Sequence, residues 1–377
     1  MRLSYIAFSV INLFLLTQLN VAEAKSSLDL LELPAKQSSL ASKSVLMAIT
    51  PVKGAVLAVG ERGHIISWKN KDDWQQQQSP VSVSLTNVTI LSDGSKIAVG
   101  HDGVILKTEN NSNAWRKVFT GAELTKLKIA QLTKQQAALK IVISETQDED
   151  VLEELTFQLE DFVFALEDNQ IELKSGPNKP LLSVARTAND VIFASGAYGT
   201  LLTSKDQGET WTLISKRLDN PDNFHLNSVI STTNGQLYIV GENGMGFHSD
   251  NQGETWSTMA MPYNGSLFGI IANPEIPEQL VAFGLQGNLM VSLDGGENWQ
   301  HKKLQTSASL LGGDFSKQGQ AYLVGHGGLI VDFSPESIET LRINKHPSGA
   351  ALSSVLVQEN SLVLAGQFGI SIWLLKK

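Results

Sequence analysis

The segment Ser204-Lys-Asp206-Gln-Gly208-Glu-Thr210-Trp211 decides the fold, because the same phrase recurs along the chain. Two further clear copies end at Trp256 and Trp299. Two eroded copies, at 67–74 and 108–115, keep the interval between the Ser or Thr and the tryptophan. An aromatic residue at constant spacing after a polar, glycine-containing turn indicates one supersecondary unit that has been copied many times.

A second marker, Gly-x-x-Gly after an apolar run, counts these units. It occurs seven times, starting at Gly60, Gly100, Gly196, Gly241, Gly284, Gly325 and Gly366. Within the unit 226–261, four short strand-like segments alternate with turns, and Gly244 is expected to take a positive φ. Four short antiparallel strands at a period of roughly 40–45 residues are typical of a propeller blade. The sequence therefore predicts an all-β fold, a seven-bladed β-propeller of four-stranded antiparallel blades.

The two ends of the chain predict how the ring closes. The last unit stops after a third strand near Leu375, with no turn phrase behind it. The early segment Leu30-Leu-Glu-Leu33-Pro34 resembles in sequence the segment 258–262, which ends the fourth strand of its unit. We therefore expect an N-terminal strand to complete the last blade, which would leave no open sheet edge at the seam.

Extra material at about 120–180 lies between blades two and three. Its core, from Glu145 to Glu172, holds eleven acidic residues and no Lys or Arg. The rest of the chain has 27 acidic and 29 basic residues, so the net charge of −9 belongs to this insertion and nucleic-acid binding is not expected. Helical spacing is one interpretation; a β hairpin turning at 168–170 and a worn extra blade are the alternatives. The apolar residues at helical spacing are Leu152, Leu155, Leu159, Phe162 and Leu166.

Residues 1–24 are typical of a secretory signal. Arg2 precedes an apolar run at 3–19, and Ala22-Glu-Ala24 is a small-x-small cleavage site. We expect residues 25–377 to form the propeller in an exported, periplasmic protein, or in a compartment like the thylakoid lumen if the source is photosynthetic. The chain has no cysteine, so burial alone must hold this fold together.

The repeated phrase, Ser/Thr-x-Asp-x-Gly-x-Thr-Trp, resembles the Asp box, or bacterial neuraminidase repeat, of sialidases, sortilin-type receptors and the photosystem II stability/assembly factor family. The repeat at 239–256 is most similar to the last of these, and the similarity covers about 45–377. In these families the box is a structural device. Its Asp can accept backbone N–H groups of its own turn, its Gly supplies φ > 0, and its Trp returns into the blade. The corresponding residues here are Asp206, Gly208, Trp211, Asn251, Gly253, Trp256, Asp294, Gly296 and Trp299.

The Asp box also raises an alternative, a sialidase-like glycoside hydrolase or a carbohydrate-binding propeller. The resemblance implies three arginines around a substrate carboxylate, a Tyr–Glu pair and an Asp. The Phe/Tyr-Arg-Ile-Pro phrase of sialidases is absent, and His101 and His326 lie on turns of different blades. We therefore expect no catalytic residue, metal or cofactor. The arginines that could test this are Arg62, Arg116, Arg186, Arg217 and Arg342.

A binding platform is the favoured function, because the Gly-x-x-Gly turns should share one broad face of the ring. Tyr198 and Phe368 are its expected aromatic anchors. The resemblance implies a non-catalytic scaffold, expected here as a monomer, that assists assembly or stability of a membrane protein complex. In photosynthetic members of the family the client is the new reaction-centre subunit of photosystem II. The candidate binding residues are Glu61, Arg62, His101, Asp102, Tyr198, Glu242, His326 and Phe368.

Overall fold

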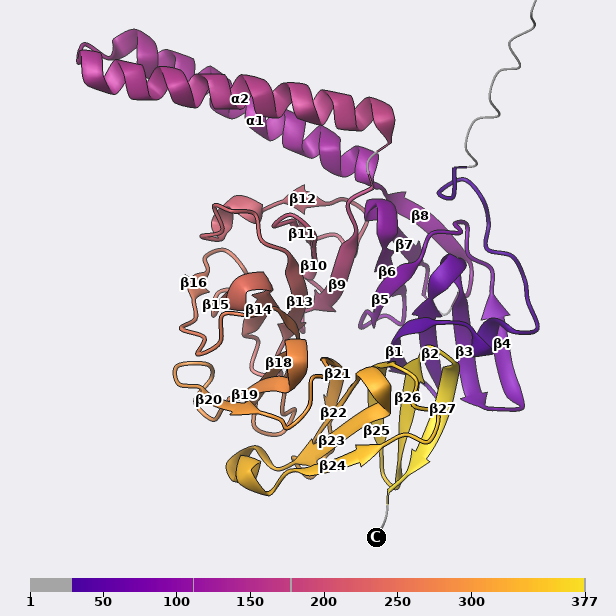
Figure 1. Ribbon diagram of the computed structural model, residues 1–377. Coiled ribbons are helices and arrows are strands. Elements are labelled where there is room, and N and C mark those ends of the chain that lie inside the picture. The colour runs from indigo at the N-terminus through magenta and orange to yellow at the C-terminus, as the bar shows by residue number, and fades with distance from the viewer. Residues whose placement is uncertain (1–28, 111, 177, 376–377) are drawn as a thin grey trace, which may run out of the picture.

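The computed structural model describes residues 29–110, 112–176 and 178–375, and shows a ring of seven β-sheets with a projecting helical hairpin (Figure 1). Six sheets have four strands and the seventh has three. This is the seven-bladed propeller that the repeats predict. The proposed signal segment, 1–24, lies outside the described residues. None of the described helices is long and apolar enough to cross a membrane.

The first four blades follow one another along the chain. Blade one contains β1 (Leu46–Val52), β2 (Ala55–Gly60), β3 (Ile65–Asn70) and β4 (Asp73–Gln77). Blade two contains β5 (Leu85–Ile90), β6 (Lys96–Gly100), β7 (Ile105–Thr108) and β8 (Trp115–Phe119). Blade three contains β9 (Leu181–Arg186), β10 (Ile192–Gly196), β11 (Leu201–Ser204) and β12 (Thr212–Leu213). Blade four contains β13 (Leu226–Ser231), β14 (Leu237–Gly241), β15 (Gly246–Ser249) and β16 (Ser257–Thr258).

The last three blades complete the circle. Blade five contains β17 (Leu267–Ala272), β18 (Leu280–Gly284), β19 (Asn288–Ser292) and β20 (Gln300–Lys303). Blade six contains β21 (Leu310–Phe315), β22 (Ala321–Gly325), β23 (Leu329–Phe333) and β24 (Arg342–Lys345). Blade seven contains β25 (Leu352–Gln358), β26 (Ser361–Gly366) and β27 (Gly369–Leu374).

Apolar packing between neighbouring blades holds the ring together. The second strand of a blade, such as β6 or β14, is buried along its whole length, which explains why these strands are continuous apolar runs. Seven hydrophobic clusters lie one at each blade-to-blade junction. The cluster that joins the two ends of the ring packs Val363 and Ala365 of blade seven against Val56 and Ile66 of blade one.

The predicted N-terminal closing strand is wrong for the described residues. Leu30 and Leu31 lie in a turn instead, and their carbonyl oxygens accept hydrogen bonds from Ser82 N and Lys117 Nζ. The reason is packing: Leu31 contacts the cluster between blades one and two, away from β27. Within the described residues blade seven therefore keeps three strands, and the short helix Ala41–Lys43 packs beside β27.

Close backbone approach explains the first glycine of each Gly-x-x-Gly marker. Its backbone is extended, but a Cβ there would lie within 2.0–2.5 Å of the carbonyl oxygen just before the blade's first strand. At Gly325 that distance, to Ser309 O, is 2.0 Å. The second glycine serves the turn itself, with a φ of 63–82° at all seven sites. The marker thus joins two separate constraints on one short turn.

The acidic insertion is a helical hairpin, so the β-hairpin and extra-blade alternatives are wrong. Helices α1 (Gly121–Glu145) and α2 (Glu149–Ser175) connect β8 to β9. The Thr120 hydroxyl caps α1 by accepting from Ala122 N. Leu124 and Thr125, each 1% exposed, bury the first turn of α1 at the base of blades two and three, and the rest of the hairpin reaches past the ring (Figure 1).

Candidate functional site

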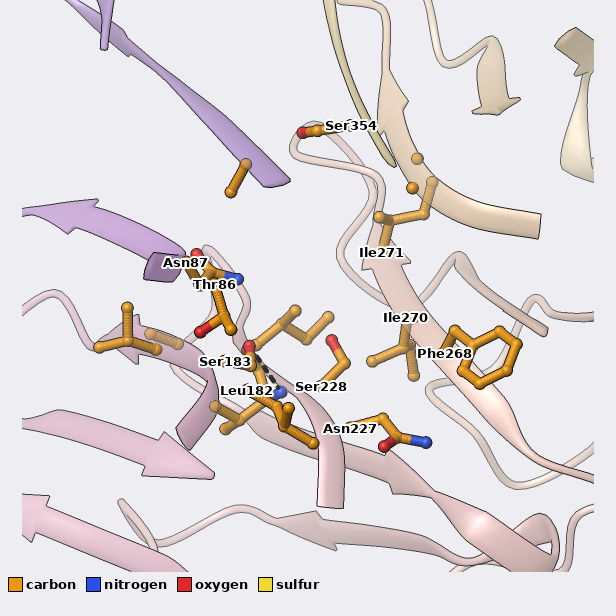
Figure 2. Close-up of a pocket in the computed structure, with 18 of the residues that line it drawn as sticks. Thr86, Asn87, Leu182, Ser183, Asn227, Ser228, Phe268, Ile270, Ile271 and Ser354 are labelled. Atoms are coloured by element: carbon orange, nitrogen blue, oxygen red, sulfur yellow. Dashed lines mark hydrogen bonds between the residues drawn. The ribbon is translucent and has the colours of Figure 1, made fainter. Parts of the chain in front are cut away.

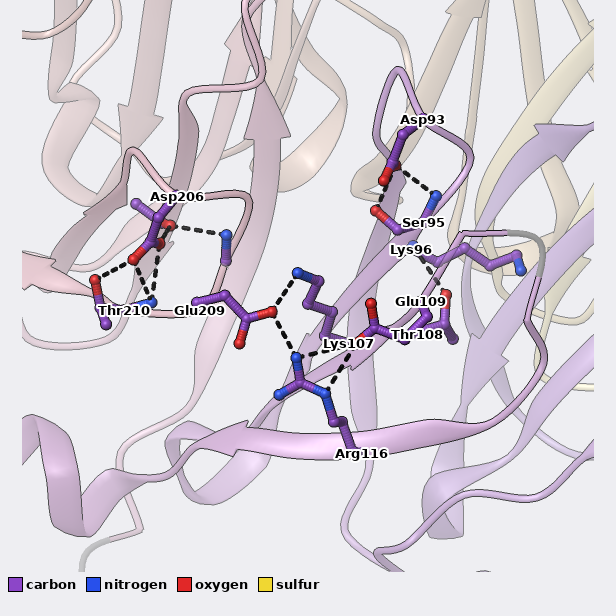
Figure 3. A network of polar contacts seen from close by, with 12 residues as sticks. Asp93, Ser95, Lys96, Lys107, Thr108, Glu109, Arg116, Asp206, Glu209 and Thr210 are labelled. Atoms are coloured by element: carbon purple, nitrogen blue, oxygen red, sulfur yellow. Dashed lines mark hydrogen bonds and ion pairs between the residues drawn. The ribbon is translucent and has the colours of Figure 1, made fainter.

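The Asp-box turns use their polar atoms inside the fold. Asp206 Oδ1 accepts hydrogen bonds from Ser204 Oγ at 2.8 Å and Thr210 N at 2.9 Å (Figure 3). Trp211 Nε1 donates to Gly208 O at 3.2 Å, which fixes the indole above its own turn. In blade five, hydrogen bonds from the backbone and side chain of Asn298 hold the pKa of Asp294 below its ordinary value.

The glutamate of the Asp box, which the sequence reading passed over, ties successive blades together. Glu209 Oε1 of blade three lies 2.5 Å from both Lys107 Nζ and Arg116 Nη2 of blade two (Figure 3). Hydrogen bonds from Arg116, and then from Lys107, lower the pKa of Glu209. Glu254 pairs in the same way with Lys205 and Arg217 of blade three, at 2.8 and 3.1 Å. Two of the five arginines are therefore part of the ring's internal bracing.

The central channel is lined by the first strand of each blade and holds a cavity of about 440 Å³. Small polar side chains on these strands bind backbone groups of the next blade (Figure 2). Thr86 Oγ1 donates to Leu181 O at 2.7 Å, and Asn227 Nδ2 donates to Leu267 O at 2.8 Å. Ser183 Oγ accepts from Val229 N at 3.2 Å. We call Thr86, Ser183 and Asn227 the channel belt. Their side chains satisfy backbone N–H and C=O groups at the inner strand edges that would otherwise lack partners.

One arginine, Arg186, is among the residues that line the channel cavity. It also pairs with Asp190 at 3.3 Å, and Arg342 of blade six pairs with Asp332 at 2.5 Å. Arg62 sits on the outer turn after β2. Among the described residues, the three-arginine cluster that the resemblance to sialidases implies is thus not found at the channel. Across the parts of the chain that the structure describes, no three His, Asp or Glu residues gather as a metal-binding group.

The eight candidate binding residues all lie on the turns between second and third strands, at one end of the ring. Arg62, His101, Tyr198, His326 and Phe368 are exposed there. Glu61 and Glu242 are half-buried, because each accepts a backbone N–H just before the first strand of its own blade. Burial also raises the pKa of Asp102.

One part of this face is more than a row of separate turns. Beside Tyr198, the base of the hairpin and blade three enclose a groove of about 690 Å³. The α1 and α2 helices form one wall, and the connection from β12 to β13 forms the other. Tyr198 is 54% exposed and has a φ of 54°, so the turn presents its ring outward. We call this the hairpin groove; its polar lining includes Lys128, Gln131, Asn169, Lys179, Tyr198, Lys216, Asp219 and Asn220.

Three lysines, Lys128, Lys179 and Lys216, line the hairpin groove together with one carboxylate, that of Asp219. Burial, and next the charge of Lys179, lower the pKa of Lys128 to about 8. Burial likewise lowers the pKa of Lys216. The Oδ1 atom of Asn169 is buried and has no hydrogen-bond partner in the described residues. A carboxylate near an apolar group would complement the lysines, and a hydrogen-bond donor on the ligand would satisfy Asn169 Oδ1.

A chain of contacts links the groove to the neighbouring blade. Lys179 Nζ lies 2.6 Å from Glu172 Oε2 and 5.4 Å from the ring centroid of Tyr198. Tyr198 packs edge-on against His225 at 5.0 Å, and His225 Nδ1 lies 3.3 Å from Glu242 Oε1. The structure therefore brings Tyr198 and Glu242 together, whereas Phe368 belongs to the turn after β26 in blade seven.

The lysines of the groove were not among the residues predicted from the sequence. They come from α1, from the segment before β9 and from the segment after β12, so no local pattern marks them as a set. A weak signal exists in α1, where Lys128 and Gln135 occupy positions that a two-helix pattern would fill with apolar residues.

Comparisons with known proteins agree on the fold. A family model described as the DUF6242 beta propeller domain matches residues 183–317, roughly a third of the chain. In sequence, no curated protein matches. Among solved structures, YCF48 bound to D1 peptide superposes with a TM-score of 0.59 at 12% identity, over 92% of this chain and 100% of that one.

Two other solved structures give the same result. YCF48 from Cyanidioschyzon merolae has a TM-score of 0.57 at 13% identity and covers 90% of this chain and 98% of its own. The extracellular domain of the putative one component system BT4673 from B. thetaiotaomicron has a TM-score of 0.59 at 12% identity, over 88% of this chain and 38% of its own. At such identities these likenesses establish a β-propeller fold and nothing finer.

Proposed function

We propose that this protein is an exported, non-catalytic scaffold that holds a polypeptide segment of a membrane protein complex in the hairpin groove and so assists the assembly or stability of that complex. The observation that carries the proposal is the groove itself, an open space of about 690 Å³ between an inserted hairpin and an exposed tyrosine. Exposed aromatic side chains beside cationic groups are common anchors of protein interfaces.

The chemistry of the groove favours a segment with a carboxylate next to an apolar or aromatic residue. Lys128 and Lys216 supply positive charge, and burial lowers the pKa of both amines, to about 8 at Lys128. A carboxylate placed there would stabilise the charged form of Lys128. The Tyr198 ring would cover the adjacent apolar group.

The fold comparison supports a peptide as the ligand. YCF48, which shares the propeller architecture, has been solved bound to D1 peptide. The resemblance of the repeats to the photosystem II assembly factor family points to the same class of partner. The signal-like residues 1–24 support the proposed export, and fractionation that found the protein in the cytosol with those residues intact would contradict it.

Catalysis is left out of the proposal for two reasons. The five arginines of the described residues are spread over four blades, and four of them are engaged in ion pairs. The polar side chains of the channel are hydrogen-bonded to neighbouring backbone groups. A sialidase-like activity therefore has no particular observation in its favour. Turnover of a fluorogenic sialoside would overturn the proposal that the scaffold is non-catalytic.

Site-specific photocrosslinking tests the groove. A benzoylphenylalanine residue in place of Tyr198 should crosslink a membrane protein subunit in intact cells. Leu293, which is 51% exposed on an Asp-box turn, is the matched control. That turn joins the third and fourth strands of its blade, whereas Tyr198 lies between a second and a third strand, and in antiparallel blades these two kinds of turn lie at opposite ends of the ring. We expect the crosslink from position 198 and none from position 293. Equal crosslinking from both positions, or none from 198, would contradict the proposal.

A further inference from the structure

The outer side of α2 carries an apolar row that the hairpin does not need. Phe157, Phe164 and Ile171 follow one another at heptad spacing and are 61%, 62% and 62% exposed. The α2 residues that pack on α1 form a different, half-buried row, which includes Leu155, Leu159, Phe162 and Leu166. In a two-helix hairpin the position farthest from the partner helix is normally polar. We call Phe157, Phe164 and Ile171 the outer stripe.

Acidic side chains surround the two phenylalanines of the outer stripe, and Lys174 follows Ile171 at its end. The positions three and four residues before and after Phe164 are all acidic, and the same holds for Phe157. In the described part of the chain, the ion pairs within and at the base of the hairpin use Glu123 and Glu172, and neither belongs to this set. The flanking carboxylates, all exposed, are those of Glu153, Glu154, Glu160, Asp161, Glu167 and Asp168.

This arrangement is unfavourable for α2 alone. Residues 153–168 span roughly 22 Å of helix at 1.5 Å per residue, and six unpaired carboxylates repel one another along that length. Exposed Phe side chains also lose the stabilisation that burial gives to apolar surface. Both penalties disappear when an apolar surface with positive charges at its edges covers the stripe.

We propose that the outer stripe docks a basic amphipathic helix of a partner protein. A helix with apolar residues one heptad apart and Lys or Arg beside them would bury Phe157 and Phe164 and pair the flanking carboxylates. A second copy of this chain would place six carboxylates against six, and an anionic lipid surface would be repelled in the same way. The charge on the stripe therefore selects a cationic partner.

The outer stripe and the hairpin groove are separate surfaces. The groove is lined by Ala165 and Asn169 of α2, whereas the stripe lies on the side of that helix opposite its half-buried row. The two surfaces have opposite charge, so they do not compete for the same segment. The inference thus goes beyond the proposed function and can fail without it.

A designed peptide tests the stripe directly. The probe is a fluorescein-labelled helix of about three heptads, with Leu at the seam positions and Lys at the flanking ones, and a second peptide has Glu in place of Lys. Fluorescence anisotropy with the mature protein should show saturable binding of the Lys peptide, weakened by added salt, and no binding of the Glu peptide. The Phe157→Ser/Phe164→Ser double variant should lose affinity by about tenfold or more.

Two controls make the outcome decisive. Ile141→Ser removes a residue that is 60% exposed on α1, and it should leave the affinity unchanged. The Glu160→Lys/Glu167→Lys variant keeps both phenylalanines and should reverse the preference between the two peptides. If circular dichroism shows that the double serine variant has lost helix, the peptide preference of the Glu160→Lys/Glu167→Lys variant still tests the inference.

Three results would overturn the inference. These are equal affinity of the double serine variant and the wild type, equal binding of the Lys and Glu peptides, and a dimer in sedimentation velocity that the serine variant abolishes. The crosslink from position 198 should persist in the double serine variant. Its loss there would show that stripe and groove act as one site.

Discussion

Asp314 links pH to the stability of the ring. It lies on β21 beside the first strand of blade seven, and its Oδ2 accepts a hydrogen bond from Val357 N at 2.8 Å. Its Oδ1 accepts from Phe315 N at 2.9 Å. Burial nevertheless raises the pKa of Asp314 to about 6, because the two hydrogen bonds only partly replace the lost water.

The sign and size of the effect follow from this shift. The folded-state pKa of about 6 exceeds the ordinary 3.8, so the folded protein binds a proton more readily than the unfolded chain. The contribution of Asp314 is therefore unfavourable above pH 6 and improves as the pH falls. Linkage gives a gain of roughly 1–2 kcal/mol between pH 8 and pH 5, and about 3 kcal/mol at pH 3 and below.

The variant Asp314→Asn isolates the pH dependence that comes from Asp314, because asparagine keeps an oxygen acceptor and does not titrate. Guanidinium unfolding, followed by tryptophan fluorescence, should be measured for both proteins at pH 8 and pH 5. The unfolding free energy of the wild type relative to the variant should rise by roughly 1–2 kcal/mol at the lower pH. His64 and His248, whose pKa values burial lowers, change stability in the opposite direction but are common to both proteins. Parallel pH dependence in the two proteins would refute the raised pKa.

Two further predictions concern the repeated turns. Gly325→Ala should destabilise the protein by about 2–4 kcal/mol, as expected for severe overpacking against backbone. Gly327→Asn should change stability by less than about 1 kcal/mol, because other blades place non-glycine residues at that positive φ. Similar unfolding midpoints for the two variants would contradict the backbone clash. Glu209→Gln should lower the unfolding free energy by about 1 kcal/mol at low salt and less at high salt, since the buried Lys107 loses its partner. The control is Glu297→Gln, because Glu297 is exposed and has no ion-pair partner in the described chain. Equal effects at both sites would count against inter-blade bracing.

The propeller could be predicted because each repeat carries its own constraint. A glycine at Gly60 or Gly325 is required by a backbone contact within the same blade, so the sequence shows it at every repeat. The strand at 30–33 could not be excluded in this way. Its apolar pattern suits a strand equally well, and the contact that decides against it is made by Leu31 with residues of blades one and two.

The hairpin was predicted only in part for a related reason. Apolar spacing in α2 indicated a helix, but α1 has Lys128 and Gln135 on its inner side, which interrupts the same pattern. Lys128 lines the groove, so one of the residues that interrupt the pattern in α1 also contributes positive charge to the site. The partners of Glu209 could not be predicted either, because they lie about a hundred positions earlier in the sequence.

Specificity in this protein is best sought in the part that breaks the symmetry. The repeated turns and the channel belt commit most of their polar groups to neighbouring backbone or to the next blade, as Asp206 and Asn227 illustrate. Such groups can bind a ligand only by giving up contacts that hold the ring. The hairpin instead adds a lysine-lined groove beside Tyr198 and an outer stripe whose carboxylates have no ion-pair partner in the described chain. A change of hairpin sequence could therefore alter the partner without loosening the seven blades, which the ring itself cannot do.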